Sequence, residues 1–195
     1  MAALPYQSFA KYTLTDNQPT LFSDSDSGKT SDRHVNGHLS SFNISYPKLL
    51  NTQFAELDGF LTDASTYKSF TITLPDREPL GVATGTPLVN GALAKGVSSI
   101  VTDGWTISQT GIMKANDLIL FAGHTHVYTV VSDANSDGSG NATLSIEPPL
   151  KQAIANNEAI TVTSVPFTLR CTKPHQSMVT PPYIYDFNFN AVEVA

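Results

Sequence analysis

One stretch of the chain has the residue types of a calcium-binding loop. Residues 133–144 read DANSDGSGNATL, and Asp133, Asn135 and Asp137 occupy positions 1, 3 and 5 of an EF-hand loop, ahead of its usual glycine. Position 12, where such a loop needs a bidentate glutamate, is Leu144, and the flanking residues alternate as strands do. The pattern predicts a hairpin loop whose polar residues bond their own backbone, with a weak calcium site as the alternative.

Two histidine pairs have spacings that occur in metal sites. His124 and His126 would lie on one face of a strand, but no carboxylate or cysteine with clear ligand spacing accompanies them. They fall between two expected strands, so we expect both rings to be exposed to solvent in the turn. His34 and His38 are four residues apart, but Asn-Gly at 36–37 favours a tight turn over a helix.

The single cysteine and the remaining motifs give no positive case for catalysis. Cys171 lies in the alternating run FTLRC, which predicts a buried strand thiol. A catalytic thiolate would need a neighbouring base, and only His175, four residues later, suggests one. No HExxH, Walker-type or GxSxG sequence occurs. We therefore expect neither an enzyme nor a bound cofactor.

The composition of the 195 residues narrows the classes of partner. Only 14% are charged, against a usual share of about 25%, so the surface must be rich in Ser, Thr, Asn and Gln. Such a surface suits a subunit that packs against copies of itself or against partners. The net charge is −6 and no Lys/Arg cluster occurs, which argues against direct binding to duplex nucleic acid or to an anionic membrane.

The N-terminus shows no targeting signal. MAALPYQSFAKYTLTD has no long apolar core and no cleavage-site pattern, and no run in the chain approaches the ~20 apolar residues of a membrane span. We expect a protein that is made in a cytoplasm and does not leave by the usual secretion route.

A strand, a helix and a second strand are predicted over residues 39–75. Residues 39–46 alternate between apolar and polar, and Pro47 ends the run. The helix follows from apolar residues at i, i+4, i+7 and i+11, namely Leu50, Phe54, Leu57 and Leu61. Asn51 or Thr52 is expected to cap it. Residues 70–74 alternate again and predict the second strand.

Two segments are expected to lack regular structure. Residues 15–32 are polar and turn-rich, which indicates a long loop or an arm that becomes ordered on a partner. Residues 76–92 hold two prolines and three glycines, which is typical of a linker or crossover.

The segment from 93 to 164 is nearly all β in its signals. Short alternating runs recur between Gly, Asn and Asp, at 97–103, 117–123, 126–133, 142–149 and 158–165. This pattern predicts a small barrel or sandwich, with a single helical turn around Leu150–Ala155.

The last part of the chain returns to long strands. Residues 167–172 alternate, and in YIYDFNFNAVEVA the aromatic residues Tyr183, Tyr185, Phe187 and Phe189 share one face, which favours a core over a ligand platform. We expect a mainly β fold in which 1–78 and 165–195 form one discontinuous domain and 79–164 form an inserted second domain.

The order of these segments resembles the distal tail proteins of long-tailed bacteriophages. The resemblance is carried by LSSFNISYPKLLNTQFAELDGFLTDASTYKSFTITLP at 39–75, by the β segments of 89–162, and by VPFTLRCT with the terminal aromatic strand. It implies a curved-sheet or β-sandwich ring domain with one packed helix, and an inserted β-barrel like the oligonucleotide/oligosaccharide-binding fold.

The same resemblance implies a place and a set of partners. Proteins of this family form a ring, usually a hexamer, at the tail tip of the virion, between the tail tube protein and the hub or tip proteins, with the tape measure protein nearby. A closed ring needs head-to-tail contacts that return on themselves. The acidic balance of the chain suggests a channel along which DNA slides without sticking, a hypothesis that a basic channel lining would overturn.

Other readings of the sequence stay open. In the first, residues 93–164 are a carbohydrate-binding module for host attachment, with Trp105, Phe121 and Tyr128 as stacking surfaces. In the second, the protein hydrolyses cell-wall material. The third is another virion part, such as a tail terminator or a decoration protein.

Overall fold

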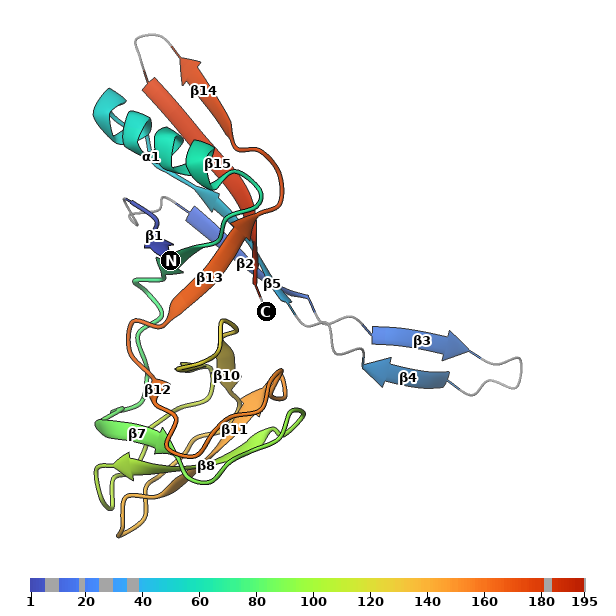
Figure 1. Ribbon diagram of the computed structural model, residues 1–195, viewed down its shortest axis with the longest axis vertical. Coiled ribbons are helices and arrows are strands. Elements are labelled where there is room, and N and C mark those ends of the chain that lie inside the picture. Colours follow the sequence, from blue (N-terminus) through green and yellow to red (C-terminus); the bar gives the residue numbers. More distant parts are fainter. Residues whose placement is uncertain (6–10, 18–19, 25–29, 35–38, 181–183, 195) are drawn as a thin grey trace. The chain divides into compact units, whose positions relative to one another are not determined.

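The computed structural model describes residues 1–5, 11–17, 20–24, 30–34, 39–180 and 184–194, which fall into two compact units. We call Met1–Thr71 with Leu169–Val194 the sheet unit and Ile72–Thr168 the barrel unit. Figure 1 labels most of their elements. The chain passes from one unit to the other inside β6 (Phe70–Thr73) and returns inside β13 (Pro166–Cys171), and these strands are neighbours in one sheet.

The sheet unit is built on a seven-stranded sheet with the order β1-β6-β13-β15-β5-β2, in which β14 also pairs with β15. The remaining strands are β1 (Ala2–Ala3), β2 (Lys11–Asn17), β5 (Leu39–Ser45), β14 (Gln176–Thr180) and β15 (Ile184–Glu193). The longest, β15, pairs antiparallel with β5 on one side and with β14 and β13 in turn on the other. It is therefore the central strand on which the sheet is assembled.

Alternation along β5 and β15 separates a buried face from an exposed one. Phe187 and Phe189 are buried, whereas Asn188 between them is exposed. The prediction that the aromatic stripe belongs to the core is confirmed for these two rings, while Tyr183 lies outside the described residues. Tyr46, directly after β5, and Phe70 of β6 add ring pairs to the same face, with Phe70 edge-on to Phe189 at 6.1 Å between centroids.

The buried face of the sheet is covered by α1 (Asn51–Ala64). Leu57 and Leu61 are fully buried, and the Phe54 ring stacks on Tyr185 with centroids 4.3 Å apart. These contacts confirm the predicted helix. Its apolar face, however, does not include Leu50, which is 70% exposed because it precedes the first helical turn.

The predicted helix cap is wrong. Asn51 and Thr52 are already helical, and Leu50 occupies the N-cap position. The Leu50 backbone N–H donates to Oε1 of Gln53 at 3.1 Å, so a glutamine inside the first turn satisfies a group that was expected to rely on a capping side chain.

Residues 15–32 were expected to be a long loop or an arm, and the loop is wrong where the structure describes them. β2 extends to Asn17, and β3 (Thr20–Asp24) pairs antiparallel with β4 (Thr30–His34). The backbone N–H and C=O groups of a two-stranded ladder bond to each other whether or not apolar and polar residues alternate. Its sequence therefore lacks the alternation by which strands are predicted. The expected turn at 36–37 and His38 lie outside the described residues.

The barrel unit contains six strands in the order β12-β9-β10-β11-β8-β7. They are β7 (Gly85–Val89), β8 (Ser99–Trp105), β9 (Leu118–Phe121), β10 (Tyr128–Val130), β11 (Ala142–Glu147) and β12 (Ile160–Thr161). A bridge between Leu88 and Ala159 joins β7 to the chain beside β12, and the Val89 N–H donates to the Glu158 carbonyl at 2.9 Å. The sheet is thereby nearly closed.

One apolar core fills the barrel. The fully buried side chains come from four strands and include Ile100 of β8, Ile119 and Phe121 of β9, Val130 of β10 and Leu144 of β11. The predicted mainly β fold, with one packed helix and a small barrel, is confirmed.

Part of the predicted linker at 76–92 is strand β7. Gly85 has φ +115° and pairs with Trp105 of β8 beside Gly104, and a bulge interrupts the register between Gly85 and Leu88. A Cβ on either residue would overlap the backbone of the opposite strand, so these glycines allow close approach of two strands and do not mark a linker.

The helical turn predicted around Leu150–Ala155 does not form. Leu150 N–H donates to the Val97 carbonyl at 2.9 Å, and Ile154 pairs with Leu93 in an isolated bridge. The backbone groups that a helical turn would use are therefore engaged by the segment that precedes β8.

Candidate functional site

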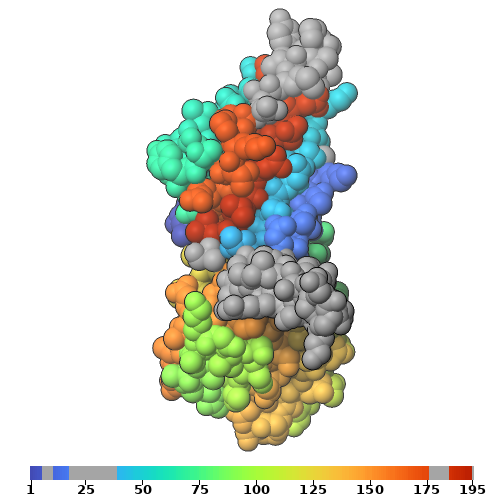
Figure 2. Space-filling model, turned by 90° about the vertical axis from the view of Figure 1, so that its right-hand side faces the viewer, coloured from blue at the N-terminus to red at the C-terminus, as the bar shows by residue number. Residues whose placement is uncertain are grey.

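The face of the sheet opposite α1 is polar and exposed. By strand pairing, its rows are Lys11–Ser45–Asn188, Thr13–Asn43–Asn190 and Thr15–Ser41–Val192, with Arg170 beside the third row. We call these ten residues the polar face. Figure 2 shows it, with β15 in red, β5 in light blue and β2 in blue lying side by side.

Amide and hydroxyl groups tie neighbouring strands of the polar face together. Asn43 Nδ2 donates to Asn190 Oδ1 at 2.7 Å, and Asn17 Nδ2 donates to Ser41 Oγ at 3.0 Å. Ser45 Oγ donates to the Lys11 carbonyl at 3.2 Å. The face is thus a flat array of neutral hydrogen-bonding groups that already bond to one another.

The charges on the polar face do not follow the acidic balance of the whole chain. Lys11 and Arg170 are exposed at opposite sides of it, and its seven other polar members are Asn, Ser or Thr. Asp186 shares its side of β15 by alternation, beyond the first row. This surface is therefore neutral to weakly basic in a protein whose net charge is −6.

The sheet ends in strands with a single partner. Among the described strands, β2 pairs only with β5, β14 only with β15, and β1 only with β6. The Tyr46 N–H donates to the Phe187 carbonyl of β15, so the backbone N–H and C=O of the preceding residue, Ser45, point toward β2. Because these directions alternate along paired strands, the backbone N–H and C=O of Leu14 point away from β5. Open edges of this kind are templates for pairing with another chain.

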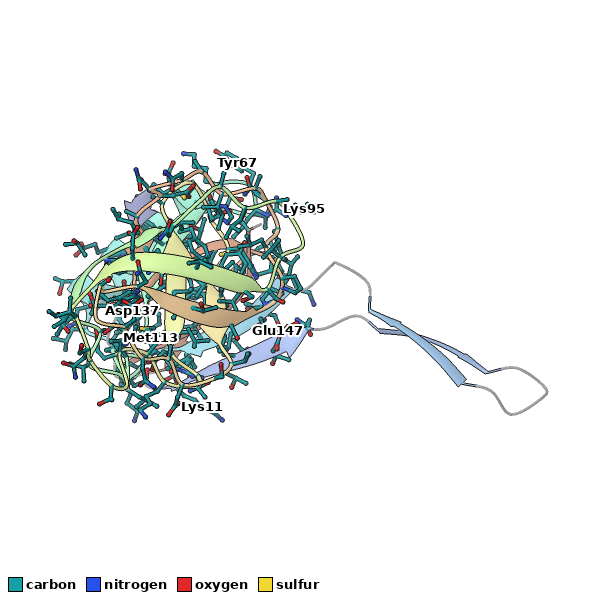
Figure 3. All side chains as sticks on the ribbon, turned by 90° about the horizontal axis from the view of Figure 1, so that it is seen from below. Lys11, Tyr67, Lys95, Met113, Asp137 and Glu147 are labelled. Carbon is teal, nitrogen blue, oxygen red and sulfur yellow. The ribbon has the colours of Figure 1, made fainter. Side chains whose placement is uncertain are left out.

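The loop singled out as a calcium candidate connects β10 to β11, as predicted for a hairpin. Its three candidate residues serve three different neighbours. Asp133 accepts from Lys114 Nζ at 2.6 Å, Asn135 Oδ1 accepts from the Gly111 N–H at 2.6 Å, and Asp137, labelled in Figure 3, accepts from Asn141. The calcium site stays a prediction.

Hydrogen bonds to the charged form lower the pKa of both carboxyls in this loop. For Asp133 the main donor is Lys114, and for Asp137 it is the backbone N–H of Asn141. Within the described part of the chain, no group of three or more His, Cys, Asp or Glu side chains is placed to bind a metal ion.

The expectation that His124 and His126 are exposed is wrong. They are 9% and 1% exposed, because the turn between β9 and β10 folds their rings onto the buried Tyr128. His124 Nδ1 lies 2.9 Å from the Tyr128 hydroxyl oxygen, and the His126 ring stands edge-on to the Tyr128 ring.

The three aromatic residues proposed as a sugar-stacking surface are interior. Trp105 is 4% exposed, and Phe121 and Tyr128 are fully buried. Trp105 Nε1 donates to Thr102 Oγ1 at 2.8 Å, so even its polar atom is directed into the barrel. These rings form the core and offer no platform to a ligand.

Cys171 is the buried strand thiol that the sequence predicts. Burial raises the pKa of its thiol to about 11, so it is protonated at neutral pH. His175, the one candidate base, pairs with Asp58 of α1 instead, at 2.9 Å from Nε2 to Oδ1.

Sequence reasoning missed three polar side chains that position the loops of the barrel unit. Asp117 is 2% exposed and accepts backbone N–H groups of Leu80, Gly81 and Lys114. Ser136 accepts from Gln109, and Glu158 accepts from Gly123. Each follows a turn or precedes a short strand, a place where polar residues are too common to stand out.

Comparison with known proteins finds one matching family and one relative. Residues 77–165, which include most of the barrel unit, match a family described as the B domain of the distal tail protein pb9. The distal tail protein pb9 of Escherichia phage T5 is 31% identical over 142 residues, which are 72% of this chain and 69% of the relative. No described helix is both long and apolar enough to span a membrane.

Proposed function

The chain belongs to the distal tail proteins of bacteriophages, a family of tail structural proteins, and on that premise we propose that it forms a ring at the distal end of the tail. The ring joins the tail tube to the tail-tip or baseplate hub. In this role the protein acts through its surfaces and carries out no chemistry.

The ring-forming part is the discontinuous domain of residues 1–78 and 165–195. The support for this assignment is the open sheet, because β2 and β14 each have one described partner and lie on different sides of β15. Two different edges on one subunit favour head-to-tail contacts, and such contacts close into a ring when the rotation between copies allows it. A hexamer, the usual state implied by the resemblance, is the size we expect.

The polar face is the surface that we assign to the channel of this ring. Asn, Ser and Thr side chains carry no charge, so an array of them neither attracts nor repels the phosphates of DNA strongly, and DNA can pass. This revises the hypothesis of an acidic lining, since the charged members of the polar face are Lys11 and Arg170.

The inserted domain, residues 79–164, extends from the ring as a peripheral barrel. Its nearly closed sheet and single core suit a module that keeps its shape without a partner. The neighbours expected for the whole protein are the tail tube protein, the hub or tip protein and the tape measure protein.

Imaging of the purified chain tests the ring directly. Mass photometry should give a mass about six times that of the 20.9 kDa chain, and negative-stain images should show rings. A chain that stays monomeric, even when the tail tube and hub proteins are added, would exclude the proposal.

A matched pair of variants tests the role of the β2 edge. Leu14→Pro removes an N–H that points away from β5, whereas Leu14→Ala shortens the same side chain and keeps that N–H. We expect the proline variant to lose rings while retaining the circular dichroism spectrum of the folded monomer, and the alanine variant to keep rings. Equal ring fractions in both would rule out pairing through this edge.

A further inference from the structure

The turn between β9 and β10 buries an unusual number of titratable groups. His124, His126 and Tyr128 are 9%, 1% and 0% exposed. The centroids of both imidazole rings lie within 5.8 Å of the centroid of the Tyr128 ring. Phe121 of β9 adds an apolar wall, with its ring centroid 5.6 Å from that of His124. Four residues of turn sequence, GHTH, thus place two imidazoles inside the end of a barrel.

A chain of hydrogen bonds links these rings to segment 149–159. The Lys151 backbone N–H donates to the Tyr128 hydroxyl oxygen at 3.1 Å, and that oxygen lies 2.9 Å from His124 Nδ1. The carbonyl of Ala153 lies near the same ring and favours a proton on it. Because the Tyr128 oxygen already accepts from Lys151, we assign its O–H as the donor to His124 Nδ1, which places the proton of the neutral ring on Nε2.

Glu158 forms further hydrogen bonds between turn 122–127 and segment 149–159. Its Oε1 accepts the Gly123 N–H at 3.0 Å, and its Oε2 accepts the Ala155 N–H at 3.2 Å. Beside it, the Ala122 N–H donates to the Ala159 carbonyl at 2.9 Å. One carboxylate therefore bonds turn 122–127 and segment 149–159 at once, next to the buried histidines.

We propose that His124, Tyr128 and Glu158 form an acid-sensitive latch, which joins turn 122–127 to segment 149–159 at neutral pH and releases them when His124 is protonated. We expect the release at this end of the barrel, because none of the hydrogen bonds that form the latch involves a residue of β8 or β11.

The protonation state of His124 follows from the groups that face it. Burial lowers the pKa of its imidazole below 6.5, and this effect exceeds the opposing attraction of Glu158 and the Ala153 carbonyl, while His126 lowers it further. The facing groups are Phe121 from β9, Tyr128 from β10, His126 from its own turn, and Lys151 and Glu158 from the second segment. The ring is accordingly neutral above pH 6.5.

The sign of the pH effect follows from linkage. A histidine with a lowered pKa in the folded state contributes its full stability above the unfolded value of 6.5. That contribution falls as the pH drops below 6.5 and continues to fall until the lower, folded value is passed. At the atomic level, a proton on Nδ1 makes it a donor, so the Tyr128 O–H must turn away from it, and the imidazolium charge is then held among buried rings.

Hydrogen exchange of the full-length protein, measured by mass spectrometry at about pH 7.5 and about pH 5.5 and corrected for the intrinsic rates, tests the latch. Peptides covering 122–127 and 149–159 should lose about tenfold in protection at the lower pH, while peptides from β8 and β11 keep theirs. Loss of protection spread equally over the whole barrel, or none at all, would overturn the proposal.

A non-titrating variant identifies the group responsible. His124→Asn places an amide oxygen where Nδ1 accepts, so the Tyr128 bond can persist while the titration is removed. We expect its turns to stay protected at both pH values. His175→Asn, which changes the Asp58-paired histidine of the sheet unit, is the control and should behave as the unmodified protein. An unchanged pH response in His124→Asn would refute the assignment.

If His124→Asn does not fold, the unmodified protein still decides the matter. NMR titration of the His124 ring signals should show a midpoint below 6.5 that coincides with the exchange transition of turn 122–127 and segment 149–159. No midpoint below 6.5, or one that is separate from the transition, would refute the latch.

Discussion

The sheet unit and the barrel unit differ in whether the edge strands of their sheets are paired. In the barrel unit β7 and β12 are brought together through Leu88 and Ala159, so the sheet nearly closes on itself. In the sheet unit β2 and β14 each keep one described partner, and the polar face stays exposed. Closure makes a fold that satisfies its own backbone, whereas an open sheet presents backbone groups that a neighbour can use.

The two units also differ in how their loops are fixed. In the barrel unit, side chains such as Asp117, Ser136 and Glu158 accept backbone N–H groups from distant turns. In the sheet unit, side-chain hydrogen bonds run across the polar face, as from Asn43 to Asn190. The barrel is thus internally braced, and the sheet unit has its polar groups arranged along a surface. We expect the barrel to be the more independent unit.

The largest expected effect separates the two cores. Phe121→Ala should destabilise the barrel unit by about 3–5 kcal/mol, because it removes a fully buried ring. The only tryptophan, Trp105, lies in the same core, so its fluorescence during urea unfolding reports on the barrel. Phe187→Ala, the matched change in the sheet unit, should leave that fluorescence transition in place. A transition that moves equally in both variants would show that the units unfold as one.

A smaller effect is expected from the bracing of the barrel loops. Asp117→Ala should cost about 2–3 kcal/mol, since it leaves three backbone N–H groups without their buried charged acceptor. The same fluorescence transition measures this loss. Asp103→Ala, at a half-buried position on the outer side of β8, provides the control, with an expected change within about 0.5 kcal/mol. Similar costs for the two aspartates would argue against bracing.

The polar face should contribute little to the stability of a single chain. Asn43→Ala should cost about 0.5 kcal/mol, because the bond to Asn190 is exposed and water replaces it. A double-mutant cycle with Asn190→Ala, followed by circular dichroism in urea, isolates the coupling between the two side chains. A coupling well above 1 kcal/mol would mean that this face is part of the structural core of the subunit.

Calcium should have the smallest effect. The oxygens of Asp133, Asn135 and Asp137 already accept hydrogen bonds from three separate partners, so millimolar calcium is expected to leave the melting temperature unchanged. Differential scanning calorimetry with calcium and with a chelator makes the comparison. A clear rise with calcium that Asp137→Ala abolishes would establish the site.

Much of the fold could be predicted because its signals are local. The aromatic stripe of β15 and the spacing of Leu57 and Leu61 reflect a buried face directly. Strand β7 was missed because Gly85 serves a close approach to Gly104, a contact with a distant strand that no local pattern records. The burial of His124 and His126 was missed for a similar reason, since it depends on a segment more than twenty residues further along the chain.

The position of the barrel within the chain bears on how such tails diversify. The chain leaves the sheet along β6 and returns along β13, and these are adjacent strands. Adjacent strands lie about 4.8 Å apart, a distance that a short turn also spans. To the sheet, the whole barrel is therefore equivalent to one loop, and recombination can lengthen, exchange or remove that loop while the order of the remaining strands is preserved.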